Sequence, residues 1–475
     1  MSSNERVFGA FEPTPLTDCR PTDIDAIIER LASDAPDGQV PLILQLVDEG
    51  ISPALILAAS FHGGLRRLDG DVGGTQHRTM ASFVATTLAE RPGDESELVA
   101  AAWAGAEMAD QLVRVGQPQP GLDSARIPTT NARAVLDDAL AGDDPERAEE
   151  AIVGLVRQTD LATASDALLA WVPRYLGHVG HSAIFAAISL RALRWCPQID
   201  PEPGLRRIAA GLGRPDAVTP GPPQDQADAW FLEIAELATS LDTDGTDGAE
   251  DPGAVSALMA AARQSDAPTM HALVADLLRQ GVGAGSIFTG TILSAAELVL
   301  RCPRKLGTAI HAVDAQHALM HAWALAQDSR ARTTLLLAAA QWLPVFRDDA
   351  LDGGWPDEPW PVELDTLAPT DPSGDLEDVL EHALSDPRDA AARLLGWWAQ
   401  GGDAARFEAV VRDLTLRKGT FDAHSYKFPF AMLESLHAID AAWRPYLAAA
   451  ATVAGPLPGF ADWASYHRVD AHAGG

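Results

Sequence analysis

The chain has 475 residues, enough for one large core or two lobes, since single hydrophobic cores stop growing near roughly 250–300 residues. Its 67 acidic and 35 basic residues give a net charge of −32, which repels nucleic acid and anionic lipid surfaces. There is no apolar run of about 18 residues and no basic leader, so we expect neither membrane insertion nor secretion. Three widely spaced cysteines without a CxxC pair favour a reducing, cytoplasmic location.

Composition and periodicity both favour helix. Apolar residues, mainly Ala and Leu, make up 47% of the chain and aromatic residues only 6%. Apolar positions recur with helical spacing, and no segment of useful length alternates as a strand would. We predict an all-α fold with helices over Asp23–Leu31, Ala54–Leu68, Met80–Leu88, Ala132–Leu140, Ala148–Val156, Ile184–Trp195, Val255–Arg263, Met270–Leu278, Ile287–Leu300, Ala312–Ala326, Thr333–Leu343, Leu376–Leu384, Ala390–Trp398 and Ala431–Ile439.

Three stretches interrupt this pattern, namely Gln117–Pro128, Ser240–Gly253 and Pro344–Gly374. The second reads SLDTDGTDGAEDPG and is the best linker candidate, because it is acidic and rich in turn residues. We therefore expect an N-terminal helical half (1–239), an acidic linker or loop (240–253) and a C-terminal helical half (254–475). The two halves are expected to form one compact domain overall.

The chain also contains a loosely repeated unit. The segments Asp48–His77 and Arg279–His311 each contain a Gly-bearing turn, an apolar helix, a loop and then a histidine that opens a new helix. LLAWVPRYLGHVGH and LTLRKGTFDAH end in the same way, on His181 and His424. The sequence thus predicts repeated helical units, each with a loop–His–helix element.

The four helix-opening histidines, His77, His181, His311 and His424, are candidate metal ligands. A single histidine is more often a core or surface residue than a ligand, but recurrence in register changes that expectation. Equivalent positions in packed repeats tend to face a common axis, so four imidazoles are expected to meet there. Neutral imidazole binds Zn, Cu, Fe and Ni and needs an acceptor on its second nitrogen. Asp314 and Asp422 are candidates for that acceptor, or else first-turn charges that complement the helix dipole.

The segment DAHSYK adds a lysine to the candidate site. His424 and Lys427 are three residues apart, so on a helix both point to one face. Burial beside metal ligands favours the neutral amine, which can react with carbon dioxide to give a carbamate, an anionic oxygen ligand. Because the chain has only three lysines, a lysine three residues after a candidate ligand would rarely arise by chance. The alternatives are an ordinary surface lysine, or a turn interrupted by Pro429.

Other histidines are weaker candidates. His62 and His178 lie near His77 and His181 and are alternative ligands in their units. His317 and His321 have i, i+4 spacing, which fits either a metal pair or a polar stripe. No Glu stands beside them as in HExxH, so zinc-protease chemistry is not indicated.

The segments YLGHVGHSAIFAAISLRAL, LGTAIHAVDAQHALMHAW and DAHSYKFPFAMLESLHAIDAAWRPYLAAAA resemble the questin oxidase-like family over most of Asp160–Ala451. That family is all-helical, and its fungal members oxidise polycyclic quinones with dioxygen, by Baeyer–Villiger-type insertion or ring cleavage. The resemblance implies a non-haem iron held by His181, His311, His424 and a carboxylated Lys427, with His424 and Lys427 in the reactive centre. His77 is assigned from the internal repeat, because the first unit lacks the family's usual cluster of closely spaced histidines.

Three functions are therefore compared. The favoured one is an oxygenase that uses iron and dioxygen on an aromatic or quinone-type substrate, with an apolar pocket drawn from Trp171, Trp195, Trp323, Phe185, Phe428 and Phe430. The second is a HEAT-like helical interaction module without catalysis. The third is the same site holding a structural zinc.

Overall fold

The computed structural model describes residues 15–17, 19–33, 39–67, 74–89, 95–115, 119, 121–176, 178–213, 222–302, 306–351, 362–419, 423–463 and 466–473. Regular structure in these ranges is helical, and pairing of the strand type is limited to an isolated bridge between Ala249 and Val282. The all-α class is confirmed. No helix in these ranges combines the length and apolar character needed to cross a membrane.

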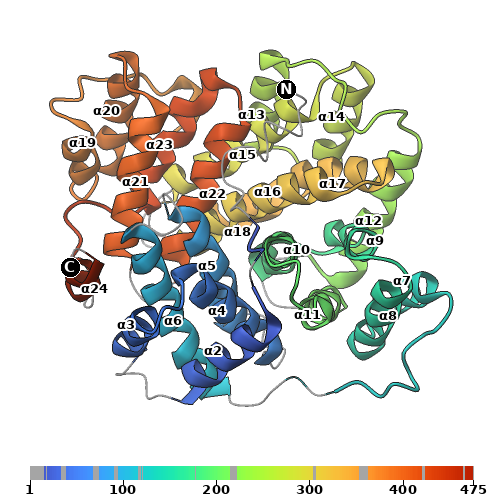
Figure 1. The fold of residues 1–475 in the computed structure, drawn as a ribbon. Helices are drawn as coiled ribbons and strands as arrows, with labels where there is room; N and C mark the ends of the chain where they lie inside the picture. Colours follow the sequence, from blue (N-terminus) through green and yellow to red (C-terminus); the bar gives the residue numbers. More distant parts are fainter. Residues whose placement is uncertain are drawn as a thin grey trace.

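The first half of the chain forms two groups of helices (Figure 1). The first group consists of α2 (Pro21–Ser33), α3 (Gln39–Asp48), α4 (Pro53–Arg67), α5 (Gly74–Leu88) and α6 (Glu95–Val115). The second contains α7 (Ala132–Ala141), α8 (Pro145–Gln158), α9 (Leu161–Leu169), α10 (His181–Trp195), α11 (Glu202–Leu212) and α12 (Gln224–Thr239), with the short 3-10 turns η2 (Val172–Arg174) and η3 (His178–Gly180).

The second half of the chain packs against both groups (Figure 1). Its first helices are α13 (Pro252–Ala262), α14 (Ala267–Arg279), α15 (Ala284–Arg301), α16 (Leu306–Leu325), α17 (Ser329–Gln341) and α18 (Leu343–Leu351), followed by the 3-10 turn η4 (Leu364–Thr366). The remaining elements are α19 (Leu376–His382), α20 (Pro387–Ala399), α21 (Ala404–Lys418), α22 (His424–Ala438), η5 (Ala441–Trp443), α23 (Arg444–Ala454) and α24 (Tyr466–Ala473). Buried apolar side chains from Cys19 to Val469 form one continuous core.

Part of the large acidic surplus is used to start helices. An aspartate in the N-cap position accepts a hydrogen bond from a backbone N–H of the first turn in eight helices, through Asp144, Asp160, Asp251, Asp266, Asp328, Asp375, Asp386 and Asp403. Such caps satisfy otherwise orphaned donors and place negative charge at the positive end of the helix dipole. In contrast, α10 and α22 begin after Gly180 and Ala423, which have no polar side chain that could cap the helix.

The predicted interruption over Pro344–Gly374 begins later than expected, since residues 362–374 hold only the 3-10 turn η4 while residues 344–351 are helical, and the alternative that Pro429 interrupts its turn was wrong. Pro344 lies in the first turn of α18, where proline costs no intrahelical hydrogen bond, so the helix runs on to Leu351. Pro429 lies inside α22, and the helix continues through it from His424 to Ala438. The turn that carries His424 and Lys427 is therefore helical, as their spacing requires.

The acidic segment Ser240–Gly253 runs from the end of α12 into the first turn of α13 and packs on the second half. The carbonyl oxygens of Thr243 and Asp244 accept hydrogen bonds from the Thr333 hydroxyl and the Trp323 indole N–H, at 3.1 and 3.2 Å. How the chain divides into folding units stays a prediction. The helices that carry the candidate ligands come from both sides of this segment.

Candidate metal centre

Four helices that are distant in sequence surround one axis near the centre of the molecule (Figure 1). Helix α5 contacts α10, α10 contacts α16, α16 contacts α22, and α22 contacts α5, which closes the ring. Each helix carries one of the four predicted histidines in its first two turns. The four helices therefore all start at the same end of the ring, and their histidines are brought together there.

The four imidazole rings form a compact square in the same order as their helices. Neighbouring ring centroids are 4.4 Å apart for His77 and His181, 4.7 Å for His181 and His311, 4.8 Å for His311 and His424, and 4.6 Å for His424 and His77. The diagonal from His77 to His311 is 5.8 Å. All four predicted histidines thus belong to one site.

The nitrogen atoms of this square lie at ligand-to-ligand distances. The Nε2 atom of His311 is 2.9 Å from Nε2 of His181 and 3.2 Å from Nε2 of His424. His77, His311 and His424 each place a ligand nitrogen within 4.8 Å of the other two. Two nitrogens about 2.1 Å from one ion are separated by about 3.0 Å at a right angle and by about 3.4 Å at the tetrahedral angle. The observed separations match the edges of a single coordination shell.

The backbone fixes which His311 nitrogen faces the site. Its Nδ1–H donates to the carbonyl oxygen of Gly307, one helical turn earlier, so Nε2 keeps its lone pair and points into the square. Asp314 was predicted as a candidate acceptor for His311, but the observed acceptor is the carbonyl oxygen of Gly307. Asp422, the second acceptor candidate, lies outside the described residues.

Lys427 and Asp314 lie together beside the histidines. Lys427 is 1% exposed and Asp314 2% exposed, and the Lys427 Nζ is 4.0 Å from an Asp314 carboxylate oxygen. Burial raises the pKa of Asp314, while the charge of Lys427 opposes that rise. The predicted surface lysine is excluded, because this amine is inside the protein next to the candidate ligands.

The electrostatics of the square favour the neutral form of His77 and His311. Burial lowers the pKa of His77 and of His311 well below the ordinary histidine value, and the nearby Lys427 charge is the next cause in both cases. The positive ends of four helix dipoles act in the same direction, since they disfavour cations at a helix start and favour anions. Neutral imidazole is the form that binds a metal ion.

The backbone before His181 is tightly constrained. Val179 has φ +52° and Gly180 has φ +79°, so two successive residues lie in the left-handed region just before α10 begins. For a β-branched residue this conformation is strained, and such strain is concentrated at functional sites. A Cβ on Gly180 would be 2.8 Å from the Cβ of Ala315 on α16. This close approach sets the position of His181 against the helix of His311.

A stacked aromatic pair holds the start of α22. The rings of Tyr426 and Trp103, from α6, are 3.7 Å apart between centroids and nearly parallel, at 19°. Tyr426 lies between His424 and Lys427 in sequence, so the stack fixes the turn that carries both candidate ligands. The sequence reasoning did not identify either residue of this pair.

The remaining histidine candidates lie outside the square or beyond the described side chains. His62 is buried in α4, where burial and, to a lesser degree, Arg66 lower its pKa to about 3, and it belongs to neither of the possible ligand groups in the described residues. The side chain of His178 is outside the described part of the chain. His317 and His321 lie further along α16 and form a second buried cluster with Glu434 and Arg191. Arg191 and Glu434 were not among the candidates from the sequence; a charged residue inside an apolar stretch indicates burial with some partner but does not identify that partner.

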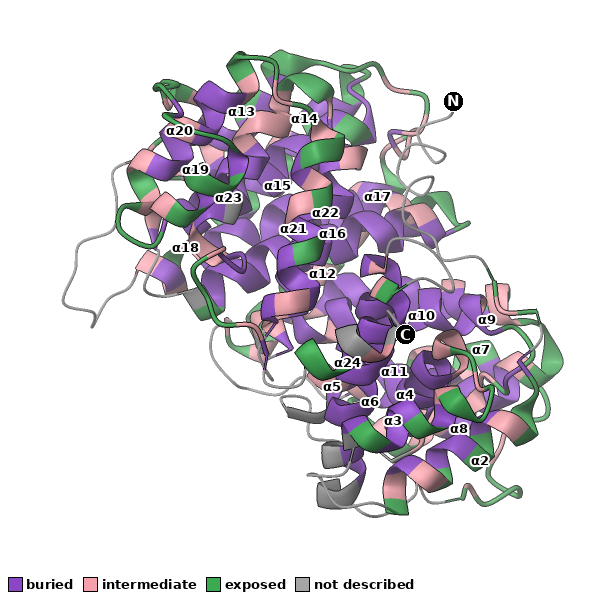
Figure 2. Ribbon diagram, turned by 60° about the vertical axis from the view of Figure 1, so that its left-hand side comes forward, coloured by how far each residue is buried: buried purple, intermediate pink, exposed green. Residues whose placement is uncertain are grey.

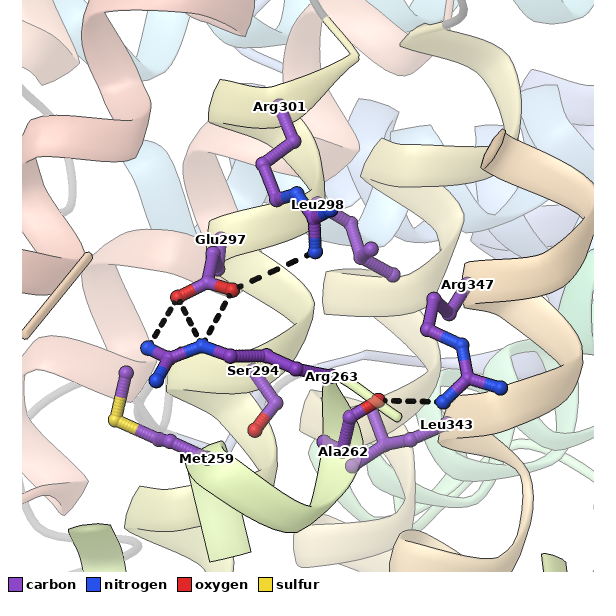
Figure 3. Close-up of a pocket in the computed structure, with 9 residues that line it drawn as sticks. All are labelled: Met259, Ala262, Arg263, Ser294, Glu297, Leu298, Arg301, Leu343 and Arg347. Atoms are coloured by element: carbon purple, nitrogen blue, oxygen red, sulfur yellow. Dashed lines mark hydrogen bonds and ion pairs between the residues drawn. The ribbon is translucent and has the colours of Figure 1, made fainter. Parts of the chain in front are cut away.

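The predicted aromatic lining has mainly structural partners. Trp171 donates a hydrogen bond to Asp137, and the Trp323 ring packs on Phe288. Phe430 lies against His317, in the second cluster. A small cavity lies between α13, α15 and α18, where Glu297 accepts from Arg263 (Figure 3), and none of the predicted site residues line it.

Comparisons with protein-family models, with curated proteins and with solved structures found no match to this chain.

Proposed function

We propose that this chain is a non-haem iron oxygenase similar to the questin oxidase-like family. His77, His181, His311 and His424 would hold one iron ion together with a carboxylated Lys427. The observation that carries the proposal is the meeting of four imidazoles near helix starts, with His311 Nε2 at coordination distance from two of them and the buried Lys427 beside the group. Iron, when bound, supplies the redox chemistry that dioxygen requires.

The donor set fits a divalent ion with one anionic ligand. The Gly307 carbonyl fixes the His311 tautomer, and burial favours the neutral, metal-binding form of His77 and His311. A buried divalent ion then needs compensating negative charge nearby. Asp314 supplies one negative charge, since a nearby divalent cation favours its ionised form.

Carboxylation of Lys427 completes this charge balance. The reaction joins the amine nitrogen to the carbon of carbon dioxide and releases a proton, which leaves a carbamate anion. The ion, the carbamate and Asp314 then sum to zero net charge. With Lys427 as an ammonium, the same site would carry an uncompensated charge of +2 in a buried environment, which is strongly unfavourable.

The other residues of the site orient and shield the ion. His181 and His311 are buried, while His77 and His424 are only partly so, which leaves the outer side of the square the more accessible one. An open side distinguishes catalytic sites from closed structural ones. The aromatic or quinone-type substrate follows from the family resemblance alone.

A structural zinc in the same residues is the second candidate function. The 3.2 Å separation of His311 and His424 lies between the octahedral and tetrahedral values of about 3.0 and 3.4 Å, so zinc also fits. A helical interaction module without a metal is less favoured, because it would bury His181, His311, Lys427 and Asp314 beside two half-buried imidazoles with no ion to offset the cost.

Variants of Lys427 test the proposal. In protein purified without a histidine tag and loaded anaerobically with Fe(II), Lys427→Arg should lose iron and dioxygen consumption with polycyclic hydroxyquinones, because arginine cannot form a carbamate. Lys427→Glu should recover part of the iron binding through its own carboxylate. Lys418→Arg is a control, since Lys418 pairs with Asp462 away from the site. Full iron occupancy in Lys427→Arg would reject the carbamate, and tight zinc binding without dioxygen consumption would favour the structural site.

A further inference from the structure

The second buried cluster centres on an ion pair between Arg191 of α10 and Glu434 of α22. Two guanidinium nitrogens donate to the two carboxylate oxygens, each at 2.8 Å, and both side chains are almost fully buried. One of these oxygens, Glu434 Oε2, also lies 2.7 Å from Nε2 of His317 and 2.9 Å from Nε2 of His321, both on α16. Despite the cost of burial, Arg191 first and the two histidines after it hold the pKa of Glu434 well below its usual range.

This cluster touches all four helices that carry the candidate metal ligands. Arg191, Glu434 and the two histidines join α10, α22 and α16. The fourth helix, α5, is reached through Phe83, whose ring centroid is 5.7 Å from the Arg191 guanidinium carbon. Figure 2 shows the neighbouring parts of α10, α16 and α22 as buried. Hydrogen bonds with such strict geometry fix how each helix is rotated and how far it is shifted along its axis.

The cluster lies one layer deeper in the ring than the metal ligands. His317 and His321 follow His311 by six and ten residues, which corresponds to about 9 and 15 Å along a helix. Arg191 follows His181 by ten residues, and Glu434 follows Lys427 by seven, about 15 and 10 Å. A small rotation of any one helix at this depth would displace its ligand at the start of the ring.

Charge argues against a second metal ion in this layer. His317, His321 and Glu434 alone have the composition of a two-histidine, one-carboxylate site. Arg191 already neutralises Glu434 through both oxygens, so a divalent ion there would add two uncompensated positive charges to a buried environment. The cluster is electrically complete without a metal.

We infer that Arg191, Glu434, His317 and His321 form a positioning network that aligns the four ligand helices and thereby sets the affinity and geometry of the metal centre. The inference rests on the proposed metal function. These residues do not bind the ion; they act through His181, His311, His424 and Lys427. Outer residues of this kind commonly change metal affinity by roughly 10–100-fold when replaced.

A matched control is available in the pair of Arg263 and Glu297. This ion pair is also double, at 3.0 and 2.7 Å, and Glu297 is 3% exposed, as Glu434 is (Figure 3). Arg263 ends α13 and Glu297 lies in α15, outside the ring of ligand helices. Glu297→Gln therefore removes a similarly buried carboxylate outside the ring of ligand helices, although Arg263 keeps Asp365 as a second partner.

The experiment measures Co(II) affinity by chelator competition, the Co(II) absorption spectrum and the free energy of unfolding for the wild-type chain, Glu434→Gln and Glu297→Gln. We expect Glu434→Gln to weaken Co(II) binding by roughly 10–100-fold and to change the spectrum. Glu297→Gln should lose stability, because it removes a buried paired carboxylate, and should keep both the affinity and the spectrum. The double variant Arg191→Met with Glu434→Gln, which has no unpaired buried charge, should fold and still bind Co(II) weakly.

Wild-type Co(II) affinity in both Glu434 variants would overturn the inference. An equal loss of Co(II) affinity in Glu297→Gln would also overturn it. Two Co(II) ions per wild-type chain, with one lost in Glu434→Gln, would overturn it by making Glu434 a ligand. Failure of the wild-type chain to bind any ion would instead overturn the proposed function.

Discussion

Replacing Gly180 by alanine tests whether the backbone before His181 packs against α16 as closely as the structure shows. Gly180 has φ +79°, a conformation that costs an alanine about 1–2 kcal/mol. The new Cβ would also meet the Ala315 Cβ at 2.8 Å and the Phe346 ring at 3.5 Å. Overpacking in a tight core adds about 1–3 kcal/mol, so the total loss should be about 2–5 kcal/mol.

Gly281→Ala separates these two contributions. Gly281 has φ +84°, but an added Cβ would have no neighbour within 4 Å. This control should therefore lose only the conformational cost of about 1–2 kcal/mol. The difference between the two variants reports the contact with Ala315 and Phe346.

Ala315→Gly should rescue the Gly180 variant in part. By itself this change costs about 1 kcal/mol, because glycine is unfavourable inside a helix. In the double variant Ala315→Gly removes the closest contact, so the double variant should lose less free energy of unfolding than the sum of the two single variants. Urea unfolding of the four proteins measures this coupling, and Co(II) competition measures the displacement of His181. Equal losses in Gly180→Ala and Gly281→Ala, or strict additivity with Ala315→Gly, would refute the reasoning.

Three further outcomes follow from the site and its surroundings. The pKa of His62 is about 3 in the folded protein, so the unfolded chain binds a proton below pH 6.5 that the folded chain does not. From pH 6.5 to 5.0 this residue should lower the free energy of unfolding by about 2 kcal/mol. His62→Leu should remove that pH dependence, and replacing the exposed His467 by leucine should not. Asp314→Asn should weaken iron binding by roughly 10–100-fold in chelator competition, because one of the two compensating negative charges is lost. Unchanged affinity would show that the site does not need this charge. Removing the metal by chelation should lower the melting temperature, and at a free metal concentration of about 100 times Kd the bound ion should add about 2.7 kcal/mol; an unchanged melting temperature would show that no ion binds the folded state.

The meeting of the four candidate histidines was predictable because the signal was local. A histidine after a loop and before an apolar helix recurs in four places, and helix-initial residues at one end of a bundle converge when the helices run side by side. The i, i+3 spacing of His424 and Lys427 was similarly sufficient to place both on one face, once α22 proved to continue through Pro429. Most of the predicted helices began about one turn late, because periodicity emerges only after the first turn, whereas the starts at Ala132 and Leu376 were predicted correctly.

The supporting residues were not predictable, because their roles depend on contacts between distant segments. Arg191 and Glu434 are 243 residues apart, and nothing in either local sequence indicates the other. The acceptor for His311 is a backbone carbonyl, which has no sequence signature. Gly180 is a common residue type before a helix, and only the fold shows that Ala315 comes close enough to exclude a side chain.

The most direct test of the metal centre is the iron and zinc content of protein purified without a histidine tag, in the wild-type chain, His311→Ala and His467→Ala. His311 is the informative ligand, because its Nε2 contacts both His181 and His424. His467 is 78% exposed in its side chain and lies in α24, so it serves as the control. We predict one iron ion per wild-type chain, the same in His467→Ala, and none in His311→Ala. A wild-type chain that stays free of iron and zinc after anaerobic loading, or iron that persists at full occupancy in His311→Ala, would contradict the four-histidine metal centre.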